Sequence, residues 1–121
     1  MCVFCNNDGL DVALENNLAL AIFDKYPVNK GHLLIIPKRH VSNFFDTSLE
    51  EREAFNELLE EGKRLLDEKY QPDGYNIGIN AGEAAGQTVF HVHVHLIPRY
   101  NGDMNDPRGG VRGVIPEKQK Y

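Results

Sequence analysis

The fold of this chain is decided by one stretch, Gln87-Thr88-Val89-Phe90-His91-Val92-His93-Val94-His95-Leu96-Ile97. Histidines stand at every second position from 91 to 95, and aliphatic residues alternate with them. This alternation predicts a strand with unlike faces, with three imidazoles on one side and aliphatic side chains entering a core on the other. Because a strand rises about 3.3 Å per residue, adjacent histidines should lie roughly 6–7 Å apart.

The spacing of the histidines limits their chemistry. One metal ion needs its nitrogen ligands at about 2 Å, and three imidazoles along a straight strand do not converge on such a point. A row of this length suits an extended polyanion contacted at successive points. A solvated strand face is the alternative, but three histidines within five residues, directly after Gly86-Gln87-Thr88, argue against it.

Length and charge limit the class of protein. The 121 residues suffice for one domain with a modest core. A net charge of −5 gives no general attraction to nucleic acid or to an anionic membrane. The longest apolar run, Leu18–Phe23, is too short to span a bilayer, and no basic leader opens the chain. We therefore expect a soluble, cytoplasmic protein with no nucleic-acid or membrane partner.

The pair Cys2 and Cys5 forms a Cys-x-x-Cys motif with three possible meanings. It could be a redox pair, although no thioredoxin-like strand and helix pattern surrounds it. It could be two inert thiols. It could also be half of a tetrahedral zinc site, which needs two further ligands.

The rest of the chain predicts four further strands and one long helix. The strands are expected over residues 11–15, 18–24, 32–37 and 75–80, with Asn16-Asn17 in the φ > 0 turn of a hairpin. The helix should begin near Ser48, where Thr47-Ser48 followed by Glu50-Glu51 offers a capping box. Its apolar stripe continues to Tyr70, and residues 41–46 form a short helical or irregular link. These elements predict an α+β fold with an antiparallel sheet over residues 2–100.

The wider run Gly86–Arg99 resembles the signature of the histidine triad (HIT) superfamily of nucleotide hydrolases and transferases, and specifically its bacterial-type proteins. The resemblance implies a five-stranded antiparallel sheet with one long helix and a short helix. It also implies a homodimer formed through the long helix and the fourth strand. Residues 101–121 would be a C-terminal tail, loop-like in composition, packed on or near the site.

The resemblance implies a role for each histidine. His93, the middle one, would attack the α-phosphorus of a nucleotide and carry a covalent nucleotidyl group. His95 would contact the phosphate and help the leaving group depart, and His32 would support the site. Free histidine titrates near pH 6.5, so neutral, nucleophilic imidazole is available at pH 7.

The resemblance also assigns binding and metal residues. Phosphate and ribose would be contacted by Asp24, Asn80, Gln87 and Thr88, and the base would lie among Val3, Phe4 and Ile22. A structural zinc ion would be held by Cys2, Cys5, His40 and His91. There is no P-loop and no carboxylate cluster beside the histidines, so no dedicated catalytic metal is required.

Two branches of the superfamily fit these motifs. One hydrolyses dinucleoside polyphosphates such as diadenosine tetraphosphate, and this is the favoured function. The other is the histidine triad nucleotide-binding phosphoramidases, which cleave phosphorus–nitrogen bonds in adenosine phosphoramidate or lysyl-AMP. Phosphorylases of the superfamily usually carry glutamine in place of the last histidine, so His95 argues against them. A nucleotide-binding sensor with incidental turnover, and a metal-binding protein using the histidine row directly, are hypotheses of other classes.

Overall fold

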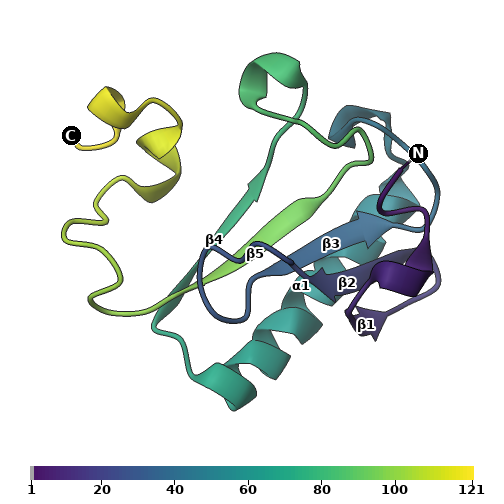
Figure 1. Cartoon of the computed structure of the whole chain (residues 1–121), viewed down its shortest axis with the longest axis horizontal. Coiled ribbons are helices and arrows are strands. Elements are labelled where there is room, and N and C mark those ends of the chain that lie inside the picture. Colours follow the sequence, from purple (N-terminus) through teal and green to yellow (C-terminus); the bar gives the residue numbers. More distant parts are fainter. Residues whose placement is uncertain (1) are drawn as a thin grey trace.

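The computed structural model describes residues 2–121, which form a five-stranded antiparallel sheet with one long helix along it (Figure 1). The strands are β1 (Val12–Glu15), β2 (Ala19–Phe23), β3 (Leu33–Pro37), β4 (Gly74–Ile79) and β5 (Val94–Arg99). Their order in the sheet is β1-β2-β3-β5-β4, so the last strand is inserted between β3 and β4. The predicted architecture is confirmed, and the bounds of the first four strands are displaced by at most one residue.

The histidine strand is shorter than predicted. β5 begins at Val94, so His91 and His93 precede it in irregular backbone. The pairing of β3 with β5 ends at Ile35 and Val94, short of Pro37, which has no N–H to donate to a ladder. The N–H of Val92 donates instead to the carbonyl of Val41 at 2.8 Å.

The turn between β1 and β2 also differs from the prediction. Positive φ among non-glycine residues is confined, within residues 2–121, to Gln71, so the Asn16-Asn17 pair does not make a left-handed turn. The Asn16 carboxamide oxygen accepts the N–H groups of Leu18 and Ala19 at 3.1 and 2.9 Å. A side-chain oxygen replaces the left-handed backbone in closing this hairpin.

The long helix α1 (Leu49–Tyr70) begins where the sequence predicts. Ser48 is the N-cap, and its side chain and that of Glu51 form a reciprocal capping box. Gln71 ends the helix with a left-handed φ of 54°, just before a proline. Gly62 lets the helix approach the sheet, because a Cβ there would lie 3.1 Å from Leu33 and 3.2 Å from Leu96.

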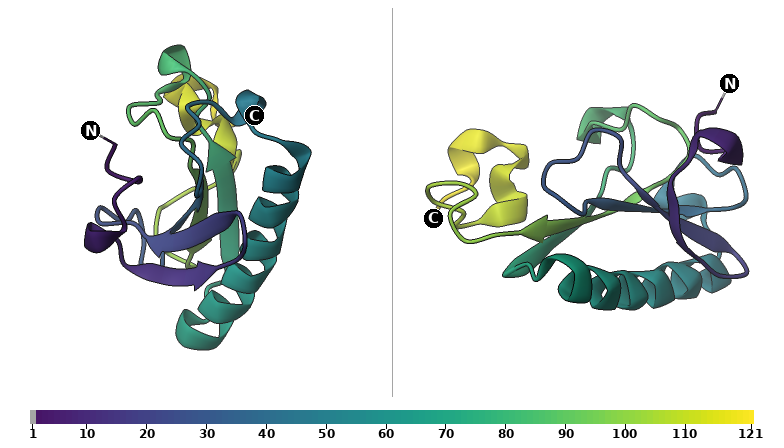
Figure 2. Two further views of the ribbon diagram at one scale, coloured as in Figure 1. Left: turned by 90° about the vertical axis from the view of Figure 1, so that its right-hand side faces the viewer. Right: turned by 60° about the horizontal axis from the view of Figure 1, so that its bottom comes forward.

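The sheet has two different faces (Figure 2). One packs on α1 through small and aliphatic side chains, and the fully buried Leu58 and Leu66 of the helix lie against it. The opposite face carries a second apolar cluster, which consists of Leu20, Ile22, Leu34 and Ile36. Phe4 and Leu10 of the N-terminal segment pack against this cluster. The candidate site lies on this second face.

The C-terminal tail contacts the edge strand β4. Residues 101–121 contain two 3₁₀ segments, Gly110–Val114 and Pro116–Lys118, and the first of these contacts β4. The tail and the N-terminal segment lie at opposite ends of the molecule (Figures 1 and 2). The short link before α1 contains one 3₁₀ turn, Phe44–Asp46. Within the described residues, α1 is too polar to cross a bilayer and no other helix is long enough to do so.

Candidate active site

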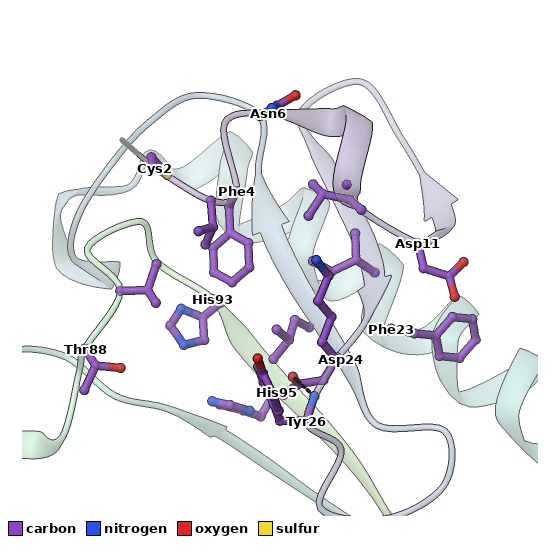
Figure 3. Close-up of a pocket in the computed structure, with 17 residues that line it drawn as sticks. Cys2, Phe4, Asn6, Asp11, Phe23, Asp24, Tyr26, Thr88, His93 and His95 are labelled. Carbon is purple, nitrogen blue, oxygen red and sulfur yellow. Dashed lines mark hydrogen bonds between the residues drawn. The ribbon is translucent and has the colours of Figure 1, made fainter.

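A cleft of about 640 Å³ opens on the face of the sheet opposite α1. This size is within the range of small-molecule sites. Its walls come from the N-terminal segment, from β2 and the loop after it, and from the stretch before β5. Figure 3 shows the His93 ring between Phe4 on one side and His95 on the other, with ring centroids 5.4 and 5.2 Å away.

The backbone fixes which nitrogen of His93 carries a proton. Nδ1 of His93 lies 3.1 Å from the carbonyl oxygen of His91. A carbonyl can only accept, so Nδ1 carries the proton and Nε2 of the neutral ring carries a lone pair. His93 lines the cleft, and its unprotonated nitrogen is therefore available to a bound electrophile.

A second chain of hydrogen bonds fixes His32 and His95. The Val28 N–H donates to Nδ1 of His32 at 3.0 Å, so the neutral His32 ring has its proton on Nε2. That Nε2–H donates to Nδ1 of His95 at 2.9 Å. His95 therefore carries its own proton on Nε2, as a hydrogen-bond donor at the cleft wall.

Burial keeps both of these rings neutral. His32 is 2% exposed, and burial lowers its pKa, partly opposed by the Asp24 carboxylate 3.6 Å away. Burial, with smaller contributions from His93 and His32, lowers the pKa of His95 to about 4. At pH 7 the pair is uncharged, and the tautomers deduced above are the relevant ones.

Of the residues predicted to contact the nucleotide, most line the cleft and some do not. Val3, Phe4 and Ile22 line the cleft with apolar side chains, and Asp24 and Thr88 contribute polar groups to it. Asn80 is half-buried and is not among the lining residues.

Gln87 also stays out of the cleft. It is 2% exposed, and its carboxamide oxygen accepts the Gly82 N–H at 2.9 Å. Its Nε2 donates to the carbonyls of Ser42 and Val89 at 2.6 and 3.1 Å. Both ends of the Gln87 carboxamide therefore bond the backbone around the loop, and the side chain is not free to bind phosphate.

The two cysteines meet two histidines beside the cleft. Sγ of Cys2 lies 3.2 Å from Nδ1 of His91, and Sγ of Cys5 lies 3.2 Å from Nδ1 of His40. All four ligand atoms lie within 4.8 Å of one another. His91 Nε2 lies 2.8 Å from the Pro37 carbonyl, which places its proton there and leaves Nδ1 free to bind a metal.

This donor set fits zinc. Two thiolates and two imidazoles are a common tetrahedral combination for structural zinc, with no position left open for water. Asp24, His32 and His95 also place ligand atoms within 4.8 Å of one another. We assign that second group to hydrogen bonding, because the facing nitrogens of His32 and His95 already share a proton at 2.9 Å.

Sequence reasoning missed several residues at the cleft. Lys25, Tyr26 and Asp11 line it, and Tyr26 is 87% exposed at its mouth. The Val28 amide, which orients His32, was also missed, since a backbone N–H leaves no trace in residue type. The signal that could have found Lys25, Tyr26 and the Val28 amide is the loop joining Asp24 to His32, because both of its ends carry site residues.

Comparisons with known proteins agree with this geometry. The family model for the HIT domain matches residues 8–102. A HIT-like protein of Methanocaldococcus jannaschii is 42% identical, over 85% of this chain and 82% of that protein. An AP-4-A phosphorylase of Mycobacterium tuberculosis is 38% identical over 83% of this chain, which spans 51% of that protein.

A solved structure gives the same result. The zinc-bound histidine triad family protein from Mycobacterium smegmatis superposes with a TM-score of 0.79 at 38% identity, covering 87% of this chain and 79% of that one. The family match covers most of the chain, and the sequence relatives and the shared fold support it. The chain belongs to the HIT family.

Proposed function

We propose that this protein hydrolyses dinucleoside polyphosphates, such as diadenosine tetraphosphate, through a covalent nucleotidyl group on His93. One observation carries this proposal: His93 has a lone pair on Nε2 while His95, next to it, has a proton on Nε2. A nucleophile and a donor thus stand side by side at a cleft with an apolar wall and a carboxylate. The wall suits a base and Asp24 suits ribose hydroxyls.

In the first step, the His93 Nε2 lone pair forms a bond to the α-phosphorus. The bond from that phosphorus to the bridging oxygen breaks, and its electron pair leaves with the polyphosphate. The departing anion needs no proton, and the His95 Nε2–H stabilises it by a hydrogen bond. The Nδ1–H of His93, donating to the His91 carbonyl, stabilises the positive charge that the ring acquires.

In the second step, water attacks the phosphorus and releases its proton to solvent. The phosphorus–nitrogen bond breaks, its electron pair returns to Nε2, and nucleoside monophosphate leaves. In phosphoryl transfer of this kind, the protein contributes mainly by positioning the reacting groups and stabilising charge. Hydrogen-bonded imidazoles supply both.

The protonation of His95 favours a phosphoanhydride over a phosphoramidate. An amine leaving group must gain a proton as its bond to phosphorus breaks. Burial lowers the pKa of His95 to about 4, so this ring holds little imidazolium at pH 7. Phosphoramidate hydrolysis is the second candidate, and the Cys-x-x-Cys motif and Asp24 remain its support.

The similarity to an AP-4-A phosphorylase supports the same substrate with a different acceptor. In that alternative, inorganic phosphate would attack the nucleotidyl group and the product would be a nucleoside diphosphate. Our proposal keeps water as the acceptor, because His95 occupies the last position of the triad.

We also propose that Cys2, Cys5, His40 and His91 hold a structural zinc ion. Support comes from their four converging ligand atoms and from the zinc-bound relative of Mycobacterium smegmatis. Bound zinc would supply a crosslink between the N-terminal segment, His40 and His91, which lies two residues before His93. The ligands of this chain would keep Phe4, which lies between the two cysteines in sequence, against the cleft.

A homodimer through β4 is a further part of the proposal. β4 is an edge strand, and Ile77 on it is 51% exposed. Such an edge favours pairing with another strand. A second copy of the chain would extend the sheet across it.

The experiment compares substrates and variants. Wild type and His93→Ala are incubated with diadenosine tetraphosphate and, separately, with adenosine phosphoramidate. We expect wild type to release AMP and ATP from the first faster than AMP from the second, and His93→Ala to release neither while still binding AMP. Equal turnover by His93→Ala would refute the proposal, and ADP formation on adding phosphate would identify a phosphorylase.

A further inference from the structure

The end of β5 and the residues just after it are hydrogen-bonded to the loop between β2 and β3. Nδ2 of Asn29 donates to the Pro98 carbonyl at 3.1 Å and to the Asp103 carboxylate at 2.8 Å. The Tyr100 hydroxyl donates to the Lys30 carbonyl at 2.8 Å. These contacts join two parts of the chain that lie about seventy residues apart in sequence.

Asp103 is itself firmly held. Nε and Nη2 of Arg99 donate to its two carboxylate oxygens, each at 2.8 Å, and the Tyr100 N–H donates to it at 3.0 Å. The remaining Arg99 nitrogen, Nη1, donates to the Asn76 side chain in β4 at 2.7 Å. The Arg99 guanidinium holds the pKa of the Asp103 carboxyl well below its ordinary value, so Asp103 is ionised throughout the working range.

This loop between β2 and β3 also orients the His32 ring. The backbone N–H of Val28 donates to Nδ1 of the His32 ring. The backbone N–H of His32 donates to the carbonyl of Asn29 at 3.1 Å. Asn29, held by Asp103 through its side chain, is therefore bound to His32 through its backbone and is the neighbour of Val28. A shift of this loop would remove the donor that keeps the His32 proton on Nε2.

We propose that Asp103 is a positioning residue which, through Asn29, keeps the Val28 N–H on His32 and thereby sets the tautomers of His32 and His95. Asp103 lies in the segment that sequence analysis assigned to a C-terminal tail, and it touches no cleft residue among the contacts given above. Its effect on turnover rests on the proposed function. Its effect on the tautomers does not.

The test measures tautomers directly, by long-range proton–nitrogen NMR of the imidazole rings in the protein without substrate. The variants are Asp103→Ala and Asn29→Ala, and the matched control is Asp106→Ala, which removes a carboxylate bonded within the tail to Arg108 and Lys120. We expect His32 and His95 to be protonated on Nε2 in wild type and in the control. In either test variant we expect a second tautomer to appear for both rings.

Kinetics on diadenosine tetraphosphate provide the second readout. We expect kcat to fall on the order of tenfold in both test variants, part of the contribution of a positioned donor, with KM little changed. The double variant Asp103→Ala/Asn29→Ala should lose no more kcat than either single variant, because both substitutions break the same hydrogen bond. Asn29→Ala leaves the Arg99–Asp103 pair intact, so it probes the link without removing that ion pair.

Two outcomes would overturn the proposal. One is wild-type tautomers in both Asp103→Ala and Asn29→Ala, checked as folded by circular dichroism. The other is additive losses of kcat in the double variant. If His93→Ala retained turnover, the proposed function would fail, but the NMR result would still decide the role of Asp103.

Discussion

Acidification should destabilise this protein through His95, and the size of the effect follows from its burial. Unfolded histidine takes up a proton near pH 6.5, whereas burial lowers the pKa of folded His95 to about 4. Between these values the unfolded chain binds more protons than the folded one. Stability is therefore complete above about pH 6.5 and is lost progressively as the pH falls toward 4.

The magnitude comes from the shift itself. Each pKa unit corresponds to 1.36 kcal/mol, so this histidine alone should reduce the free energy of unfolding by about 3 kcal/mol between pH 7 and pH 4. That is a large fraction of the 5–15 kcal/mol typical of a domain. Release of bound metal and titration of the other histidines add to the total, so the effect of His95 must be measured as a difference.

The assay is urea unfolding of wild type and His95→Gln at pH 7 and pH 4. Glutamine keeps an acceptor for the His32 Nε2–H but does not titrate. We expect wild type to lose about 3 kcal/mol more than the variant over this interval, a difference in which metal release and the histidines not coupled to His95 cancel. Equal losses would refute the assignment of His95 as a neutral, half-buried hydrogen-bond partner.

Three further predictions concern other parts of the site. Cys5→Ser should reduce bound zinc from about one ion per chain to almost none, measured by metal analysis after gel filtration; retained zinc would point to a different site. Phe4→Ala should weaken AMP binding about tenfold in calorimetry, the value of one aromatic contact, and unchanged affinity would remove Phe4 from the base slot. Gln87→Ala should lower the free energy of unfolding by about 1–3 kcal/mol, because the Gly82 N–H and two carbonyls lose their partner. If Gln87→Ala instead weakened AMP binding at wild-type stability, Gln87 would be a phosphate ligand.

The elements that the sequence predicts well are those set by local pattern. Alternation places the strands, because a side chain on a strand has only two faces to choose between. The capping box of Ser48 and Glu51 fixes the start of α1 through contacts three residues apart. The convergence of Cys2, Cys5, His40 and His91 was inferred from family resemblance, since nothing local joins these positions.

The features that the sequence does not predict depend on distant partners. β5 begins at Val94, where the pairing with β3 ends two residues short of Pro37 and the Val92 N–H turns to the Val41 carbonyl. Gln87 turns into its loop because its carboxamide bonds the Gly82 N–H and the Val89 carbonyl of that loop and also the distant Ser42 carbonyl. The tail lies against β4 because of contacts that its loop-like composition does not reveal.

The central claim is that Nε2 of His93 forms a covalent bond to the α-phosphorus of the substrate. The direct measurement is rapid mixing with radiolabelled diadenosine tetraphosphate, an alkaline quench that preserves phosphorus–nitrogen bonds, and peptide mapping of the label. We expect an AMP adduct on His93 that forms and decays at rates consistent with turnover. Turnover with no adduct on His93 at any time point would contradict the mechanism.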